Sequence, residues 1–355
     1  MDSQLTLFTE TIPTTTKFPS TRYQGSKQKF VDWIWQCIKD IPFTTALDAF
    51  GGTACVSYKM KEEGKKVVYN DILPFNSIIG KALIENDDTF LNDDDIEYIL
   101  NRRSDVSYPN FIEKTFKDIY FTEEENLWLD VVSTNIRSID DEYKRAIAYF
   151  ALFQSCIIKR PYNLFHRKNL YVRLQDVKRS FGNKKTWDTS FETHFLKFVK
   201  EANDAVFEGC NKCVSINRDV FDIDVKCDLV YIDTPYINES GVGVDYADFY
   251  HFLNGIVDYD NWNSRIDYKS KHLRLLRKPN VWNEQNNIYQ AFEKLFKKFS
   301  DSVLVISYRS NGVPTIKELV TLLIEMGKDV KIYQSNEMKY VLSSKVSNEV
   351  LIVAK

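Results

Sequence analysis

The pattern of apolar and polar positions changes character twice along the chain. From residue 29 an amphipathic helical pattern leads into short apolar runs at 44–50 and 65–71, with a helical stretch at about 53–63 between them. A strand, a glycine turn, a helix and a second strand in this order are typical of the start of a doubly wound α/β sheet. The first twenty residues (1–20) have little periodicity and are expected to form an arm.

The alternation of strands and helices stops after residue 80 and resumes near residue 211. The intervening region (81–210) is expected to be a mostly helical insertion, with a buried helix at 143–158. Strand-like apolar runs return later, and a polar, aromatic stretch at 237–300 is predicted to be a second insertion. We therefore predict one sheet built from residues 21–80 and 211–355, whose later strands lie at 213–219, 226–236, 302–309, 329–333 and 349–355.

Composition favours an ordinary globular protein. The 355 residues are 44% hydrophobic, and the longest apolar stretch (146–158) is too short to span a bilayer. Six scattered cysteines indicate reduced thiols, and the N-terminus lacks the basic-then-apolar pattern of a secretory signal, so a cytoplasmic location and no membrane partner are expected. The formal charge of -3 at first argues against nucleic acid, because dedicated binders are usually basic.

The glycine turn after the first strand is a candidate ligand site. The strand ends in LDAF and continues as GGTA, which places the backbone of Gly51 and Gly52 at the carboxyl edge of the sheet. Asp71 ends the next strand, where such folds hydrogen-bond both hydroxyls of a ribose. Gly52 and Asp71 together suit an adenosine-bearing ligand without a pyrophosphate. An ordinary tight turn with a solvated Asp is the alternative.

A second candidate site is the tetrapeptide Asp233-Thr234-Pro235-Tyr236, directly after a predicted strand. A planar exocyclic amine is a poor nucleophile because its lone pair is delocalised, and it needs acceptors for its N–H groups as the nitrogen becomes tetrahedral. Asp233 can accept one hydrogen bond and a backbone carbonyl held by Pro235 another, while Tyr236 offers a face for a planar base. Alternatively, the strand ends in a simple proline turn with Tyr236 in the core.

Taken together, the motifs resemble the D12-class, Dam-like DNA adenine-N6 methyltransferases. The resemblance implies a Rossmann-like methyltransferase sheet that uses S-adenosyl-L-methionine to methylate a flipped adenine at a specific sequence in double-stranded DNA. It also implies a restriction-modification system, with a cognate restriction endonuclease as a possible partner. The motifs are RYQGSK (22–27), DAFGGTA (48–54), YNDI (69–72) and DTPY (233–236), supported by RPYNLFHRKNLYVR (160–173) and ISYRSNGVP (306–314).

The resemblance also assigns residues. Asp233, the carbonyl of Thr234 and Tyr236 would hold the target base, with Pro235 keeping the loop rigid. Two positions depart from the family pattern, since Thr234 stands where Pro is usual and Ala54 where Gly is usual, but neither change removes a chemical group. The cofactor contacts implied by the resemblance are Tyr23, Lys27, Phe50, Gly52, Asp71 and Asp219.

Two basic segments change the picture given by the overall charge. Residues 159–185 contain nine Lys and Arg against one Asp, with interleaved aromatic residues, and residues 265–278 contain six against one. Such a composition is typical of a nucleic-acid surface, although a solvated loop that balances acidic helices is the alternative. The candidate DNA contacts are Arg160, Arg167, Lys168, Arg173, Arg179, Lys271 and Arg274.

No structural metal is expected. Cys210 and Cys213 have the spacing of zinc ligands but lack a second pair, and the acidic run 93–95 is more typical of a helix cap. Competing functions are methylation of cytosine N4 in DNA, of adenine in RNA or of a glutamine side chain, and a catalytically silent DNA-binding regulator. The order of the motifs, with the long insertion before residue 233, favours adenine in DNA.

Overall fold

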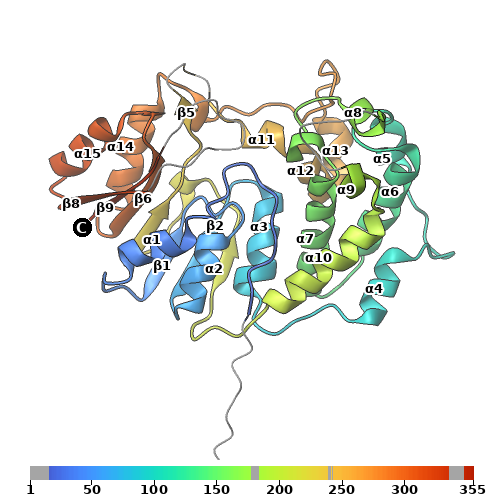
Figure 1. Ribbon diagram of the computed structural model, residues 1–355, viewed down its shortest axis with the longest axis horizontal. Coiled ribbons are helices and arrows are strands. Elements are labelled where there is room, and N and C mark those ends of the chain that lie inside the picture. The colour runs from blue at the N-terminus through green and yellow to red at the C-terminus, as the bar shows by residue number, and fades with distance from the viewer. Residues whose placement is uncertain (1–15, 177–183, 239–240, 242, 336–347) are drawn as a thin grey trace, which may run out of the picture.

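The central feature of this computed structural model, which describes residues 16–176, 184–238, 241, 243–335 and 348–355, is a seven-stranded sheet (Figure 1). Its strands are β1 (Thr45–Asp48), β2 (Lys66–Asn70), β3 (Val214–Ile216), β4 (Leu229–Ile232), β6 (Val303–Arg309), β8 (Val330–Gln334) and β9 (Glu349–Ala354). The order across the sheet is β3-β2-β1-β4-β6-β9-β8. The first five are parallel neighbours, whereas β9 runs antiparallel to both β6 and β8. The seven strands predicted from the apolar runs are thereby confirmed.

Helices cover both faces of this sheet. Successive residues of β4 point to opposite sides, so Leu229 and Tyr231 belong to one apolar core and Val230 and Ile232 to the other. Burial on both faces explains why the central strands are continuous apolar runs rather than alternating ones. The fold is a mixed α/β arrangement with a largely parallel central sheet. Helices α1 (Val31–Ile38), α2 (Cys55–Glu62) and α3 (Pro74–Gly80) contribute to the first core, and α14 (Ile288–Lys298) and α15 (Ile316–Glu325) to the second.

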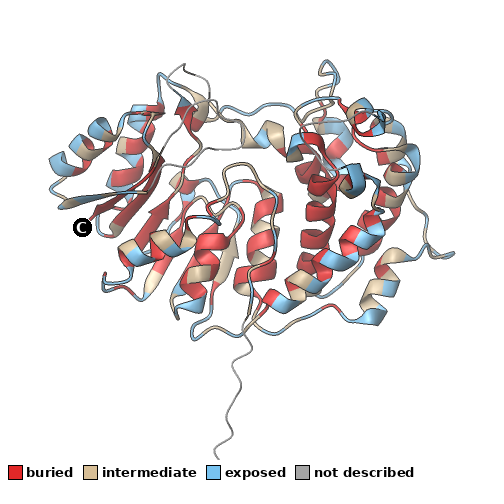
Figure 2. Ribbon diagram, in the orientation of Figure 1, coloured by how far each residue is buried: buried red, intermediate tan, exposed pale blue. Residues whose placement is uncertain are grey.

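A group of helices lies beside the sheet, in the green and cyan half of Figure 1. Its centre is α7 (Glu142–Ile158), in which every residue from Ala146 to Ile158 is buried (Figure 2). This confirms the buried helix expected at 143–158. The first apolar core runs without a break from the sheet through α7, so the two halves share one core. The remaining elements are η1 (Lys81–Glu85), α4 (Asp93–Leu100), α5 (Phe111–Thr115), α6 (Glu123–Arg137), η2 (Pro161–Asn163), α8 (Leu170–Leu174), α9 (Lys184–Asp188) and α10 (Phe191–Ala205).

The acidic run 93–95 forms the first turn of α4. Asn92 caps the helix by accepting a hydrogen bond from the backbone of Asp95, and the Asp95 carboxylate accepts one from the backbone of Asn92. Acidic side chains at a helix N-terminus are favoured by the helix dipole. The interpretation of this run as a helix cap is confirmed.

The segment after the tetrapeptide crosses from the sheet to the helices and back (Figure 1). Trp262 of α13 packs against Phe111, Phe116 and Phe252, and a Cβ on Gly255 would lie 1.9 Å from the Trp262 ring. The close contact with Gly255 packs α13 on α12 within the segment, and the contacts of Trp262 with Phe111 and Phe116 attach the segment to the helical half. Its elements are β5 (Ile237–Asn238), which pairs with β7 (Gly312–Val313), then α11 (Tyr246–Phe249), α12 (His251–Val257), α13 (Tyr259–Arg265) and η4 (Val281–Asn283).

Two expectations from the sequence concern the N-terminal arm and the absence of a membrane-spanning stretch, and the structure addresses them only for the residues that it describes. Residues 1–15 of the predicted arm lie outside it, whereas Ser20 donates hydrogen bonds to Glu201 from its backbone and its hydroxyl, at 2.8 and 2.6 Å. In the part of the chain that the structure describes, no helix has both the length and the apolar character needed to cross a membrane.

Candidate functional site

A cavity of about 950 Å³ opens at the carboxyl edge of the parallel strands. Its walls come from the turn after β1, the end of β2, the η3 turn (Val220–Asp222) after β3 and the loop after β4. These segments are far apart in sequence, and the parallel topology brings their ends to one edge. The predicted residues that line the cavity are Tyr23, Lys27, Phe50, Gly52, Asp71, Asp219, Asp233, Thr234 and Pro235.

The glycine turn is shaped by the side chain of Tyr69. A Cβ on Gly51 would lie 2.0 Å from the Tyr69 ring, so only glycine fits there without rearrangement. Gly52 has φ +52°, and its N–H donates to the Asp71 carboxylate at 2.9 Å. Ala54, where the family pattern has Gly, is also left-handed with φ 67° and is buried at the start of α2. The turn therefore keeps the glycine-like backbone despite the alanine.

Asp71 is a buried carboxylate whose orientation is fixed by its neighbours. Its Oδ2 accepts hydrogen bonds from the backbone of Gly52 (2.9 Å) and the amide of Asn76 (3.0 Å), and its Oδ1 accepts one from the backbone of Leu73 (2.8 Å). Burial raises the pKa of Asp71 to about 6, although these hydrogen bonds oppose the shift. Because a carboxylate offers about four acceptor positions, roughly one remains for a ligand donor.

Asp48 carries a buried oxygen with unmet bonding capacity. The Ser57 hydroxyl donates to Oδ2 at 2.6 Å, whereas Oδ1 has no hydrogen-bond partner among the described residues. Burial raises the pKa of this carboxyl to about 7. Leaving a buried acceptor unpaired is costly, so a carboxylate on the cavity wall with such an oxygen indicates a ligand that brings a donor or a positive charge.

Asp233 lies in a buried network with Lys27 and Tyr236. The Tyr236 hydroxyl donates to Asp233 Oδ1 at 2.6 Å, and the Lys27 ammonium lies 3.1 Å from the same oxygen. Lys27 also donates to the Tyr236 hydroxyl and forms an ion pair of 2.9 Å with Glu349. Burial raises the pKa of Asp233 to about 6, with Lys27 opposing the shift and Glu349 adding to it. This network orients the carboxylate at the cavity wall.

Tyr236 contributes its hydroxyl to the site and keeps its ring away from the cavity. The side chain is 7% exposed and does not line the cavity, and its ring packs edge-on against Tyr308 at 5.5 Å. The Lys27 ammonium and the Arg309 guanidinium lie 4.9 and 5.9 Å from the ring centre. Stacking of a base on Tyr236 therefore stays a prediction.

Sequence analysis missed four aromatic residues of the cavity wall, which are Phe221, Tyr231, Tyr246 and Trp282. Tyr246 stacks on Tyr23 at 5.5 Å, and Tyr23 stacks in turn on Tyr250 at 4.7 Å. Trp282 packs edge-on against Phe50 at 5.2 Å. Tyr246 and Trp282 both lie in the stretch 237–300, whose lack of periodicity gave no signal of where its side chains point.

The side chain of Asp219 stabilises the turn in which it lies. Its Oδ1 accepts a hydrogen bond of 3.0 Å from the backbone of Phe221, which starts the η3 turn, and the Phe221 ring stacks on Trp282 at 5.9 Å. The side chain of Asp219 is nevertheless exposed at the cavity. The position is consistent with a ligand contact beside an aromatic wall.

The structure corrects the prediction that Arg160 and Arg173 face DNA. Arg160 is 1% exposed, and its guanidinium donates to the carbonyl oxygens of Tyr120 (2.9 Å), Leu164 (3.3 Å) and Arg167 (3.2 Å). Arg173 is also buried and binds both carboxylate oxygens of Glu125 at 2.6 and 2.9 Å. Lys159 pairs with Glu125 as well, at 2.9 Å. These basic side chains satisfy buried hydrogen-bond acceptors of the protein.

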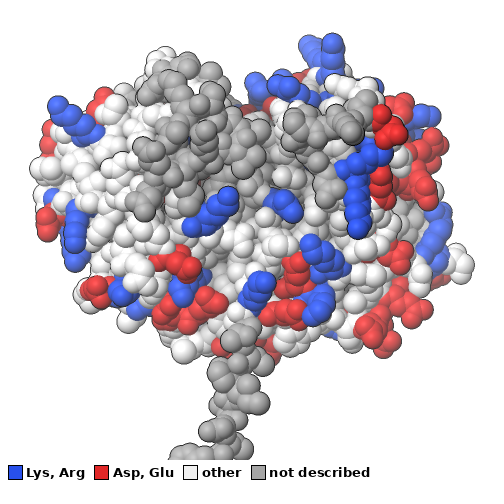
Figure 3. Space-filling model, in the orientation of Figure 1, with Lys and Arg blue, Asp and Glu red and all other residues white. Residues whose placement is uncertain are grey.

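Other predicted DNA contacts do reach the surface. Arg167, Lys168 and Lys271 are exposed, whereas Arg274 is half-buried and pairs with Asp267 at 3.2 Å; Arg179 lies outside the described residues. Figure 3 shows basic side chains along the upper edge of the helical half and acidic ones along its lower edge.

The charge excess of the second basic segment is smaller in the fold than in the sequence. Arg265 pairs with Asp258, and Arg277 lies 3.9 and 3.5 Å from Asp245 and Asp248. These three acids precede the segment in the chain and were therefore left out of its count. Lys269, Lys271, Lys278 and Arg277 remain the exposed charges of the segment, and of these Arg277 lies near two acids.

Comparison with known proteins identifies similar chains. The sequence model of the D12 class N6 adenine-specific DNA methyltransferases matches residues 23–310. Type II methyltransferase M2.HphI of Haemophilus parahaemolyticus is 29% identical over 329 residues, which cover 90% of this chain and 91% of that protein. Type II methyltransferase M.CviAII of Paramecium bursaria Chlorella virus 1 is 22% identical over 92% and 95% of the two chains. Modification methylase LlaI of Lactococcus lactis subsp. lactis is 26% identical over 85% of this chain and 48% of that protein.

Proposed function

This chain belongs to the D12 class of N6 adenine-specific DNA methyltransferases, and on that premise we propose that its cavity binds S-adenosylmethionine beside an adenine flipped out of double-stranded DNA. The observation that carries the proposal is the convergence of nine predicted residues on one cavity of about 950 Å³. The names of the relatives support a further step, that the enzyme modifies a specific sequence within a restriction-modification system, and we propose that it works beside DNA in the cytoplasm. A cognate restriction endonuclease is then the expected partner.

The residues of the cavity suit the proposed cofactor. S-adenosylmethionine supplies a methyl group activated by a positively charged sulfonium. The unpaired Oδ1 of Asp48 suits a cationic or donor group, and the remaining acceptor position of Asp71 suits a ribose hydroxyl. The glycine turn allows close approach, with Phe50 and Trp282 as flat apolar walls.

Asp233 is the proposed acceptor for the target amine. Its carboxylate would take one N–H group of adenine N6 and the carbonyl of Thr234 the other, so that the nitrogen lone pair is directed at the methyl carbon. Tyr236 and Lys27 hold the carboxylate in place, and the buried wall excludes water. Because an ionised acceptor is needed, activity should fall as the pH drops through the pKa of Asp233, about 6.

The helical half and the stretch 237–300 are the proposed DNA-recognition region. Arg167, Lys168 and Lys271 are exposed there and can neutralise phosphates, and Arg179 stays a candidate by sequence alone. We retain the boundaries 81–210 for the helical insertion and 21–80 with 211–355 for the catalytic part, in which 237–300 is an insertion with possible DNA contacts.

Asp233→Ala tests the proposal. We expect methyl transfer to fall by on the order of 10³-fold or more, because the acceptor for the amine is lost. S-adenosylmethionine binding, measured by calorimetry, should stay within about threefold of wild type, since about 0.7 kcal/mol or less is then lost. Asp224→Ala, an exposed change nearby in sequence, is the matched control and should be silent.

Unmethylated genomic DNA treated with enzyme and cofactor, then mapped by single-molecule sequencing, gives the product. N6-methyladenine at one sequence supports the proposal. N4-methylcytosine would instead establish the cytosine alternative, near-normal transfer by Asp233→Ala would refute the role of Asp233, and failure of the wild type to bind the cofactor would revive the silent regulator.

A further inference from the structure

We propose that Glu349 is a positioning residue of the methyl-transfer site, which holds the Lys27 ammonium beside Asp233 and shares its positive charge, so that Lys27 does not pair with Asp233 alone. The proposal rests on the role proposed above for Asp233. Glu349 lies beyond residue 310, the last residue of the family match, and no sequence motif pointed to it.

The hydrogen-bond geometry of Lys27 supports this role. Lys27 is 4% exposed, and its ammonium lies 2.9 Å from Glu349 Oε1 and 3.1 Å from Asp233 Oδ1, and donates to the Tyr236 hydroxyl. An ammonium has three hydrogens, and these three protein acceptors all lie within reach of them. Lys27 thus acts as a clamp between the tetrapeptide and β9, while its aliphatic stem can still line the cavity.

The sheet explains how a residue so late in the chain reaches the site. Glu349 is the first residue of β9, which runs antiparallel to β6 and places Glu349 opposite Arg309 at the end of β6. The start of an antiparallel strand lies at the same edge as the carboxyl ends of its parallel neighbours. Glu349 is 1% exposed there, and the Ser307 hydroxyl donates to its Oε1 at 2.5 Å. A buried carboxylate with this many partners is built into the site.

The second carboxylate gives Glu349 its function. Without Glu349 the Lys27 ammonium would pair with Asp233 alone, whereas with Glu349 the ammonium is shared between two carboxylates. Positive charge moves onto N6 as its lone pair forms the bond to the methyl carbon and the electrons of the breaking bond return to sulfur, and one N6 proton then passes to Asp233. A preorganised Asp233 carboxylate that is not fully neutralised by Lys27 stabilises that developing charge.

Glu349 also acts on the titration of Asp233. The groups that face Asp233 are Lys27 and Tyr236. Its electrostatic environment also includes Glu349, Asp48, Cys55, Tyr231 and Tyr246. Burial raises the pKa of Asp233 first, Lys27 lowers it, and the negative charge of Glu349 raises it. Removing that negative charge should therefore lower the pKa of Asp233 and move the acid limb of activity to lower pH.

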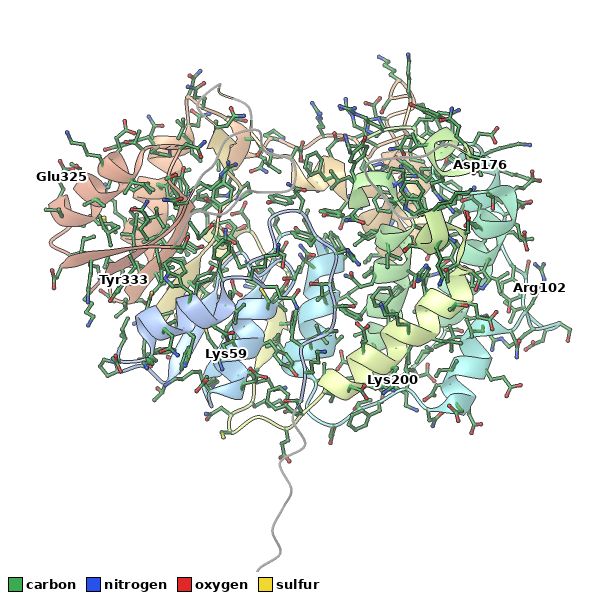
Figure 4. The ribbon with its side chains drawn as sticks, in the orientation of Figure 1. Lys59, Arg102, Asp176, Lys200, Glu325 and Tyr333 are labelled. Atoms are coloured by element: carbon green, nitrogen blue, oxygen red, sulfur yellow. The ribbon has the colours of Figure 1, made fainter. Side chains whose placement is uncertain are left out.

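Glu349→Gln is the test, because glutamine keeps the shape and the acceptor oxygen while the charge is lost. We expect kcat at pH 8 to fall by about tenfold to a hundredfold, with cofactor affinity within about threefold of wild type. The acid limb of kcat should move to lower pH. Glu349→Asp, which keeps the charge, should leave the acid limb near that of wild type. Glu325→Gln is the control, since Glu325 is exposed at the outer end of α15, away from the site (Figure 4).

The outcomes separate this proposal from the one on which it rests. Glu349→Gln with wild-type kcat and an unmoved acid limb would overturn the positioning role, provided that Asp233→Asn is inactive in the same assay. An active Asp233→Asn would instead overturn the proposed role of Asp233 itself. If thermal unfolding shows that Glu349→Gln does not fold, Glu349→Asp is the deciding variant. An acid limb of kcat displaced as far as expected for loss of the charge would contradict the proposal. An acid limb at the wild-type pH would support it.

Discussion

The cavity and the basic segment 159–185 were both expected from sequence to be functional. The two regions differ in how many of their predicted residues reach the expected surface. Nine of the ten predicted catalytic and cofactor residues line the one cavity, and Tyr236 is the predicted residue that does not. In the basic segment, Arg167 and Lys168 are exposed whereas Arg160 and Arg173 are buried. A strand end fixes where a side chain lies, but the net charge of a segment does not fix where its members point.

The backbone conformation around Arg160 explains why its side chain points into the protein. The chain leaves the buried helix α7 and bends sharply, with Tyr162 and Asn163 at φ 63° and 58°. Such a bend inside the protein leaves carbonyl groups without helical partners, and these must be satisfied. Arg160 meets the need with a planar, five-donor guanidinium that reaches several of them at once. The charge of Arg160 therefore stabilises the folded chain.

The largest effect is expected for Arg160→Ala. We expect the free energy of unfolding in urea to fall by about 3–5 kcal/mol, because several buried carbonyls lose their donor. Arg160→Lys should recover little, since one ammonium cannot reproduce the fork. Lys168→Ala, eight residues along, is the matched control and should change stability by no more than about 0.5 kcal/mol. A stable Arg160→Ala protein with weakened DNA binding would contradict this contrast between the two regions, because Arg160 would then act as a DNA contact.

An intermediate effect is expected when Arg167 and Lys168 are both changed to Ala. DNA affinity should fall by about tenfold at ~0.1 M salt, and the slope of log K against log salt should become shallower by about 1–2, because two phosphate contacts are lost. Cofactor binding should be unchanged. The matched control is a double change of Lys197 and Lys200, which are both exposed on α10; Lys200 lies at the lower side of the molecule in Figure 4. An equal loss in the control would mean that overall charge, and not this surface, binds DNA.

Sequence predicted most of the fold, because the apolar runs of buried strands and the strong periodicity of α7 are local signals. The strand-end motifs then placed Asp71 and Asp233 at one edge. What it missed depends on long-range geometry. Glu349 reaches the site only because β9 is antiparallel, and Tyr246 lies in a stretch without periodicity. The inward turn of Arg160 depends on carbonyl groups that become buried only once the chain has folded.

The smallest effect is expected for Ala54→Gly, which tests whether the one departure in the cavity turn is only a matter of backbone conformation. An alanine at φ 67° costs about 1–2 kcal/mol relative to a right-handed residue, whereas glycine adds about 0.4–1 kcal/mol of unfolded-state entropy. We therefore expect a net gain of about 0.5–1 kcal/mol in thermal unfolding, with kcat within about twofold of wild type because no chemical group is lost. Ala151→Gly, the same change inside α7, is the control and should destabilise by about 1 kcal/mol. If Ala54→Gly is as destabilising as Ala151→Gly, the buried methyl of Ala54 contributes more through packing than its backbone costs, and the turn would then have been fitted to alanine by its neighbours.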